Sequence, residues 1–324
     1  MDYNPLIMDF VLKREGGEKI ILDKSFAESI AKELKDNNIS TGTILLAATE
    51  FWLDPTYVFR YNKPNVVEFR GRYDIVIVAN IFNSNGGRIS LTGKSGGRTP
   101  RKPDRGTKGA QVTQLEDQTI VGPERGNPNP ATAGTDGENG GHANSITLYC
   151  NELMNIEVFA NGGRGGDGGE GGDGGNVCIE DSDPTTDIGS CFIIDGAVGA
   201  DGGKGGNGGQ GGNAGNIELF YCNAPDDFVI TDHLSCNGGK GGLPGTGGAG
   251  GLGGIAITPD RRADSGKPGL PGNFLGNGQT LVPSVNKITL DELLQKILEL
   301  ESEPSGSSNF MRMVMNHLKR DSVR

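Results

Sequence analysis

Three glycine tracts repeat with a period of three along this chain, and this period constrains the fold more than any other feature. The tracts span residues 162–176, 202–216 and 238–254, and in each of them two glycines are usually followed by one other residue. A period of three is typical of the polyproline II helix, which has three residues per turn and no internal hydrogen bonds. An ordered tract of this kind must therefore bond to neighbouring segments of the chain.

Flexible linkers are the alternative interpretation of these tracts, because glycine-rich runs are often linkers. The Gly-Gly-x repeat is interrupted at few positions. The main interruptions are Ala214, Pro244 and the shortened triplet Gly-Thr-Gly at 245–247. Each tract begins with two glycines that directly follow an Asn or Asp: Asn161, Asp201 or Asn237. These three residues are 40 and then 36 positions apart. Internal repeats of this size favour a stacked architecture of ordered segments over linkers.

The third residue of each triplet indicates what the edge of a tract faces. In the first two tracts these residues are charged or polar, so we expect both edges to face water; they are Arg164, Asp167, Glu170, Asp173, Asn176, Lys204, Asn207, Gln210 and Asn213. In the third tract they include Leu243, Ala249 and Leu252. We expect this last edge to turn toward apolar side chains.

Two other period-three or glycine-rich architectures fit less well. Collagen needs glycine at every third position and frequent proline, whereas here glycine fills two positions of three. Calcium-binding β-rolls have a nonapeptide repeat, and only 162–167 matches its GGxGxD signature. Weak calcium binding by Asp167, Glu170 and Asp173 stays open as an alternative.

Composition limits the classes of function. Only 34% of the 324 residues are hydrophobic and 6% aromatic, so a conventional core cannot run throughout the chain. The net charge of −11 argues against nucleic acid as a partner. No stretch is long enough to span a membrane, and the start has no signal-peptide pattern. We expect synthesis in the cytoplasm, followed by incorporation into a virion, release or non-classical export.

The regions outside the tracts carry conventional secondary-structure signals. A capping box at 25–28 predicts a helix to about Lys35, with Phe26, Ile30 and Leu34 on its apolar face and an end at 37–38. Strands are expected at 43–52, 57–61, 66–69, 73–79, 146–150, 156–160, 177–179, 192–195, 217–222, 228–231 and 255–258. The polar residues at 151–155 are expected to form a turn between the strands at 146–150 and 156–160. The five cysteines lie between tracts, which indicates buried thiols, with one or two disulfides as the alternative.

The C-terminal part is helical in pattern. A second capping box at 289–292 precedes a leucine-rich stripe, and residues 310–320 predict another helix. These helices either cap the stack or provide a surface for a protein partner or self-association. The residues of that surface would be Leu293, Leu294, Ile297, Phe310, Met311, Met313 and Val314.

Catalytic patterns are absent from the sequence. The three histidines are scattered, and no nucleophile and base, phosphate-binding loop or cysteine pair with metal-ligand spacing is found. We therefore expect a non-enzymatic protein with no cofactor and no dedicated metal site.

The interrupted Gly-Gly-x tracts resemble polyglycine II proteins, above all the glycine-rich adhesins at the tips of phage long tail fibres. Glycine-rich arthropod antifreeze proteins are a second type. The resemblance covers about residues 134–254 and is one of architecture. It implies that loops between tracts contact a receptor, here 180–187, 223–227 and 259–265. The implied binding residues are Glu180, Asp181, Asp183, Asp187, Asn223, Asp226, Asp227, Arg261 and Arg262.

The predicted fold class is mainly β and polyglycine II: a solenoid- or sandwich-like stacked repeat of short β-strands and polyglycine II helices. A small N-terminal α/β region at 1–90 would precede the glycine-rich domain at 91–280, and C-terminal α-helices at 281–324 would follow. The predicted function is structural or adhesive, by binding a protein or glycan receptor on a cell surface or matrix. A module of a larger bacterial toxin or export assembly, and an ice-binding protein, are the alternatives.

Overall fold

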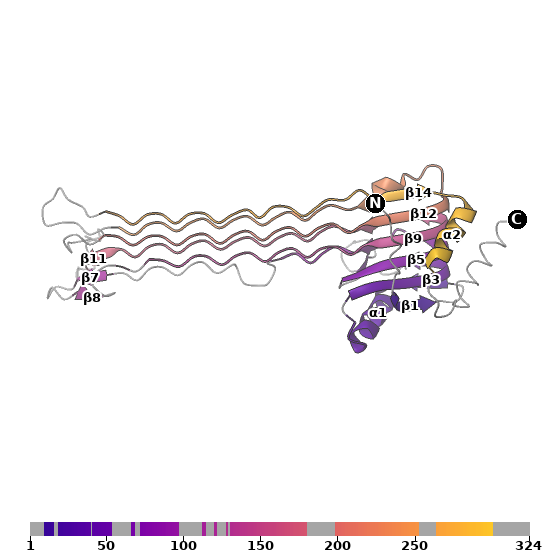
Figure 1. The fold of residues 1–324 in the computed structure, drawn as a ribbon, viewed down its shortest axis with the longest axis horizontal. Coiled ribbons are helices and arrows are strands. Elements are labelled where there is room, and N and C mark those ends of the chain that lie inside the picture. Colours follow the sequence, from indigo (N-terminus) through magenta and orange to yellow (C-terminus); the bar gives the residue numbers. More distant parts are fainter. Residues whose placement is uncertain are drawn as a thin grey trace.

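A seven-stranded parallel sheet forms the head of the molecule, from which a long arm projects (Figure 1). The computed structural model describes residues 10–15, 19–39, 41–53, 66–68, 72–96, 112–114, 120–121, 128, 130–179, 198–252 and 264–300. The sheet has the order β1-β3-β5-β9-β12-β14, and β2 also pairs with β3. Its strands are β1 (Phe10–Glu15), β2 (Lys19–Leu22), β3 (Thr41–Leu53), β5 (Arg72–Asn83), β9 (Ile146–Asn155), β12 (Ile217–Asn223) and β14 (Ser284–Lys287).

The predicted fold class is wrong. The head is an α/β arrangement built on long parallel strands, and it is not a stacked repeat of short strands and polyglycine II helices. The physical reason lies in β3 and β5, whose central residues 44–48 and 75–79 are all buried. Near-continuous apolar strands of this kind are stable in a parallel sheet that is covered on both faces. Strands as far apart in sequence as β1, β9 and β14 join this one sheet.

Helix α1 (Lys24–Asp36) and a second sheet cover one face of the large sheet. The second sheet has the order β13-β10-β6-β4, and its strands are parallel: β4 (Val66–Glu68), β6 (Arg88–Ser90), β10 (Val158–Phe159) and β13 (Leu234–Ser235). Ile30 and Leu34 of α1 join the main hydrophobic core together with Ile89 and Val158. The predicted apolar face of α1 is thus confirmed. Its N-cap is Asp23, which accepts a hydrogen bond from the Phe26 N–H at 2.7 Å, so the predicted capping box at 25–28 is wrong.

Helix α2 (Leu290–Leu300) packs on the other face of the large sheet. Leu293, Leu294 and Ile297 are buried with Val76 and Val78 in a second hydrophobic cluster. Thr289 and Glu292 form the predicted capping box: Glu292 accepts hydrogen bonds from the backbone N–H and the hydroxyl of Thr289. These bonds, the backbone one first, lower the pKa of the Glu292 carboxyl.

Two local elements expected from the sequence, one turn and one strand, are wrong. The turn predicted at 151–155 belongs to β9, which runs without interruption from Ile146 to Asn155. The strand predicted at 228–231 is replaced by a 3-10 turn, η2 (Ile230–His233), in which the ring of His233 stacks on Phe228 at 4.7 Å. The strands predicted at 57–61, 192–195 and 255–258 lie outside the described residues.

The glycine tracts form the arm, together with flanking segments that carry fewer glycines. Outgoing segments, defined as 91–96, 160–176 and 236–252, follow β6, β10 and β13 of the smaller sheet. Returning segments, defined as 130–145, 198–216 and 264–283, lead into β9, β12 and β14 of the large sheet. The arm thus has an outgoing and a returning layer, each of which continues one sheet of the head (Figure 1).

Backbone hydrogen bonds join the segments at every third residue. Within a layer, neighbouring segments are parallel: Gly165 N–H donates to Lys240 O and Gly168 N–H to Leu243 O. Between layers they are antiparallel: Gly206 N–H donates to Gly169 O, and Gly209 N–H to Gly166 O. The linker interpretation predicts no such bonds.

Close packing between segments explains why the arm needs glycine. A Cβ built on Gly206 would lie 2.0 Å from the carbonyl oxygen of Thr135, and one on Gly165 would lie 2.1 Å from that of Gly209. These neighbours are backbone atoms, so a side chain fits only if two segments move apart. Ordering a glycine costs more conformational entropy than ordering any other residue. Here that cost is offset because glycine lets two backbone segments come close enough to form hydrogen bonds.

We expect Gly206→Ala to lower the free energy of unfolding by about 3 kcal/mol or more, because it forces two backbone segments apart. Chemical denaturation monitored by circular dichroism measures this change. Lys204→Ala is the matched control, since the Lys204 side chain is exposed on the same segment, and its effect should stay within about 0.5 kcal/mol. Equal effects of the two substitutions would contradict the packing described above.

Candidate functional site

The outer side chains of the arm form a ladder of hydrogen bonds between neighbouring segments. Asp136 shows the pattern: its Oδ1 accepts the N–H of Asn207 at 2.6 Å, while the N–H of the next residue, Gly137, donates to the carbonyl of Asn207 at 2.8 Å. Each such rung therefore satisfies both backbone groups of one residue on the neighbouring segment. Buried or half-buried backbone groups need partners of this kind.

Aspartate and asparagine supply most rungs, because a short side chain with an oxygen at the δ position reaches the neighbouring N–H. The accepting side chains within the returning layer are those of Asp136, Asn139, His142, Ser145, Asp201, Asn207 and Asn213. Within the outgoing layer they are those of Asn161, Asp167, Asp173 and Asn176. The third residues of the triplets thus hold the arm together as well as facing water.

The last outgoing segment departs from the expectation that its edge faces apolar side chains. Leu243 is 64% exposed, Leu252 is 41% exposed, and Ala249 is also exposed. This expectation is wrong because the third positions of this segment are exposed in the same way as those of the preceding segments, such as Arg164 and Lys204. Pro244 and the step 245–247 are also not breaks, since Leu243, Thr246 and Ala249 accept hydrogen bonds in one continuous register.

The calcium alternative finds no support in the geometry. Asp167 accepts hydrogen bonds from Leu243 N–H and from the Arg164 guanidinium, and Asp173 accepts from Ala249 N–H. Glu170 also has a partner. The three carboxylates are spaced along one segment, and within the described part of the chain no three His, Cys, Asp or Glu side chains converge as metal ligands would.

Of the predicted binding loops, 223–227 is the one that falls wholly within the described residues. It lies in the head: Asn223 is the last residue of β12 and extends a row of hydrogen-bonded amides with Asn151 and Asn80, and Asp226 and Asp227 follow it. The predicted residues Glu180, Asp181, Asp183, Asp187, Arg261 and Arg262 lie outside the described residues. The strand that precedes 180–187, β11 (Val177–Ile179), lies at the distal end of the arm (Figure 1).

A small sheet at this distal end escaped the sequence analysis. It joins β11 (Val177–Ile179), β7 (Val112–Gln114) and β8 (Ile120–Val121), with β11 and β7 parallel and β8 antiparallel to β7. Only β11 was expected, because β7 and β8 are short β-branched runs within a stretch that otherwise has a loop-like composition. The distal end is therefore held by pairing between segments far apart in sequence.

The proposed partner surface on α2 is not available. Leu293 and Ile297 have 0% exposure and Leu294 has 8%, since all three face the large sheet. The other members of that prediction, Phe310, Met311, Met313 and Val314, lie outside the described residues. Neither described helix has the length and hydropathy needed to cross a bilayer.

Buried thiols are confirmed for three of the five cysteines. Cys150, Cys222 and Cys236 are free and buried. Burial raises the pKa of each of these thiols, so little thiolate forms near neutral pH. Nothing in this arrangement points to a reactive cysteine.

Comparisons with known proteins identify no family. No family model matches the chain, and no curated protein matches it. Among solved structures, a springtail antifreeze protein from Granisotoma rainieri, titled a nine polyproline type II helical bundle, matches with 22% identity. The match covers 56% of this chain and 93% of that protein, but its TM-score is 0.08, so it carries no argument about fold or function.

We expect Asn207→Ala to expose the backbone amide of Asn273, because Asn207 Oδ1 accepts that N–H at 2.9 Å. The loss of one exposed rung should cost about 1 kcal/mol. Amide hydrogen exchange should show faster exchange at Asn273, with the rates of the head unchanged. Lys204→Ala is the control, because it removes a third-position side chain that accepts no N–H from the neighbouring segment. If the exchange rate of the Asn273 amide were unchanged in both variants, the ladder would be contradicted.

Proposed function

We propose that this chain is a non-enzymatic attachment protein that binds a protein or glycan on a cell surface or matrix through the distal end of its arm. The observation that carries the proposal is the unbroken hydrogen-bonded register from the sheets of the head to that end. A segment such as 160–176 spans about 50 Å at the rise of about 3.1 Å per residue that a three-residue repeat has. An arm of this length and order suits a spacer better than an enzyme scaffold.

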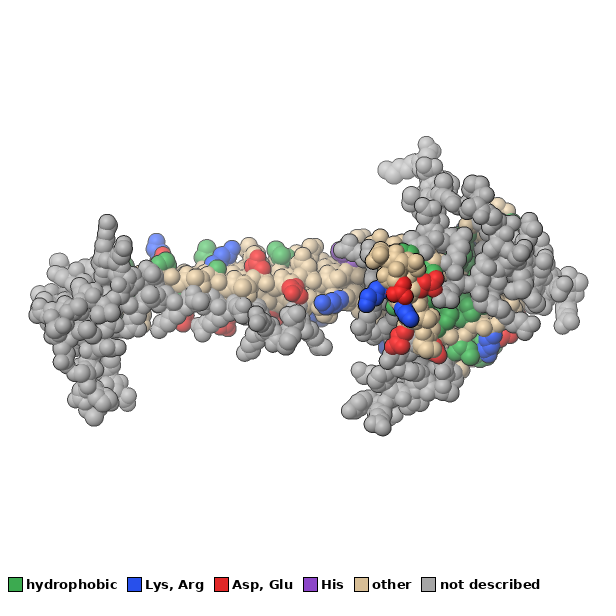
Figure 2. Space-filling model, turned by 90° about the horizontal axis from the view of Figure 1, so that it is seen from below, with side chains coloured by type: hydrophobic (Ala, Val, Ile, Leu, Met, Phe, Trp, Pro, Cys, Tyr) green, Lys and Arg blue, Asp and Glu red, His purple; other side chains and the backbone are tan. Residues whose placement is uncertain are grey.

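The surface chemistry of the arm supports this assignment. Between the two ends, the surface consists mostly of backbone and uncharged polar side chains, with scattered charged and apolar side chains (Figure 2). The sequences that connect outgoing to returning segments, in contrast, are rich in recognition chemistry: acidic residues at 180–187 and the pair Arg261-Arg262. Polar and charged side chains of this kind give specificity at protein and glycan interfaces.

The two alternatives have less support. Ice binding needs a flat, weakly polar face, but Arg164, Asp167 and Glu170 lie in succession along one side of the arm. Thermal-hysteresis measurement tests it directly, and we expect no activity. The role as a module of a toxin or export assembly uses the C-terminal helices as the junction, but the apolar residues of α2 are buried in this chain's own core.

Two replacement variants test the proposal. In the distal variant, residues 182–194 are replaced by a glycine-serine loop; in the matched head variant, residues 225–227 are replaced in the same way. Labelled chains are applied to a printed glycan array and to a panel of immobilised matrix and envelope proteins. We expect the full chain and the head variant to bind the same probes and the distal variant to lose at least tenfold in affinity.

Circular dichroism and amide exchange of the arm verify that both variants fold. Loss of binding in the head variant, with the distal variant unaffected, would contradict the proposal. Absence of any binding by the full chain to both panels would also count against it.

A further inference from the structure

The last returning segment, 264–283, departs from the glycine rule chiefly in one column, with Leu275 as a single departure in the neighbouring column. Each of its residues pairs with the residue 66 positions earlier, on the preceding returning segment. Thus the side-chain oxygen of Asp201 accepts the N–H of Lys267, and that of Asn207 accepts the N–H of Asn273. The glycines at 202, 205 and 208 donate their N–H groups to this last segment. By the same register, the residues at the equivalent donor positions of the last segment are Pro268, Pro271, Phe274, Asn277 and Thr280.

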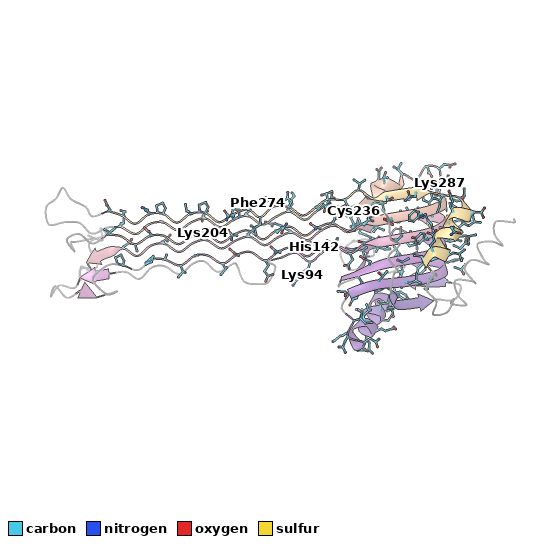
Figure 3. All side chains as sticks on the ribbon, in the orientation of Figure 1. Lys94, His142, Lys204, Cys236, Phe274 and Lys287 are labelled. Carbon is cyan, nitrogen blue, oxygen red and sulfur yellow. The ribbon has the colours of Figure 1, made fainter. Side chains whose placement is uncertain are left out.

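Packing explains why the earlier segment needs glycine in this column and the last one does not. A Cβ on Gly202 would lie 2.2 Å from the carbonyl oxygen of Gly248, and one on Gly208 would lie 2.1 Å from that of Gly242. These carbonyls belong to 236–252, the last outgoing segment among the described residues, so side chains in the same column of 264–283 meet no further described outgoing segment. Side chains are therefore sterically allowed there, and Phe274 stands on this outermost segment of the arm (Figure 3).

The side chains in this column occupy or remove the hydrogen-bond donors of the edge. Pro268 and Pro271 have no N–H to offer to a further segment. Asn277 Oδ1 accepts the N–H of Gly241, and Thr280 Oγ1 accepts the N–H of Gly238, each at 2.9 Å.

The neighbouring outgoing segment, 236–252, is treated in the same way. Pro244 occupies its donor column between Gly241 and Gly247, which removes one more N–H. The Phe274 ring packs against this segment, since a Cβ on Gly241 would lie 2.8 Å from its Cε2 atom. The donor edges of both layers are thus modified on the same side of the arm.

The third positions of the last two segments carry fewer oxygen acceptors than those of the earlier segments. Earlier segments carry Asp or Asn at many of these positions, and their oxygens bond the next segment. The last outgoing segment instead carries Lys240, Leu243, Ala249 and Leu252, with an oxygen at Thr246, and the last returning segment carries Lys267 and Leu270, with oxygens at Asn273 and Gln279.

We propose that these side chains form an edge cap, defined as Pro244, Pro268, Pro271, Phe274, Asn277 and Thr280, that prevents the arm from pairing with a second copy of this chain. The complementary acceptor edge is the first long returning segment, 130–145. No backbone N–H of the described residues donates to the carbonyls of Ala133, Asp136 or Asn139 there. Unprotected edges of hydrogen-bonded arrays associate with one another, and proline is a common means of blocking them.

An open-edge variant tests the proposal: Pro268→Gly, Pro271→Gly and Phe274→Gly in the full chain. The matched control, Lys267→Gly, Leu270→Gly and Asn273→Gly, introduces as many glycines into the same segment but at third positions. Sedimentation velocity is measured over a hundredfold range of protein concentration at physiological ionic strength. We expect the self-association constant of the open-edge variant to rise at least tenfold above that of the full chain, and that of the control to stay unchanged.

Two results would overturn the edge cap. One is an open-edge variant that sediments as the full chain does while amide exchange shows an intact arm. The other is self-association of the full chain that the open-edge substitutions abolish, because the exposed Leu270 and Phe274 edge would then be an interface between copies. If the open-edge variant loses arm protection, the milder pair Pro268→Ala and Pro271→Ala restores two donors without added glycine, and the same criterion applies to it.

Discussion

Hydrogen bonding between neighbouring extended segments at every third residue is the interaction on which the arm depends. An extended chain of this kind has no bonds within itself, so every N–H and C=O must find a partner on another segment or in water. The bonds Gly206 to Gly169 and Gly168 to Leu243 show the two directions in which partners are found, across the layers and within one layer. Glycine is required because a Cβ at either contact would meet a backbone atom.

The head makes this pairing possible. Its strands β9, β12 and β14 are neighbours in one parallel sheet, so the segments that lead into them arrive side by side and in register. The register crosses the junction without interruption, as Ile146 N–H donates to the carbonyl of Asn216. Burial of β3, β5 and the apolar stripe of α2 stabilises the sheet. The cost of ordering so many glycines is thus offset by a head that aligns them beforehand.

Local features were predicted well from the sequence, whereas long-range pairing was not. The apolar face of α1 and the capping box Thr289–Glu292 follow from periodicity and composition within one turn of helix. The fold class was wrong because the sequence does not show that β3 and β5 lie at the centre of a parallel sheet. The polar residues Asn151 and Asn155 suggested a turn, but Asn151 bonds Asn80 on the adjacent strand, which satisfies its amide within β9. Leu243 was misplaced because its apolar side chain suggested a buried edge, whereas it is exposed as Arg164 and Lys204 are at third positions of the other segments. The acidic and basic turns chosen as binding sites stay predictions.

Amide hydrogen exchange along the full chain tests the central claim most directly, because it measures whether the arm glycines are hydrogen-bonded. The account predicts strong protection of Gly165, Gly168, Gly206 and Gly209, and loss of that protection together with unfolding of the arm. Exchange of these amides at the rate of an unstructured peptide, while β5 stays protected, would show that the tracts are linkers and would contradict the account.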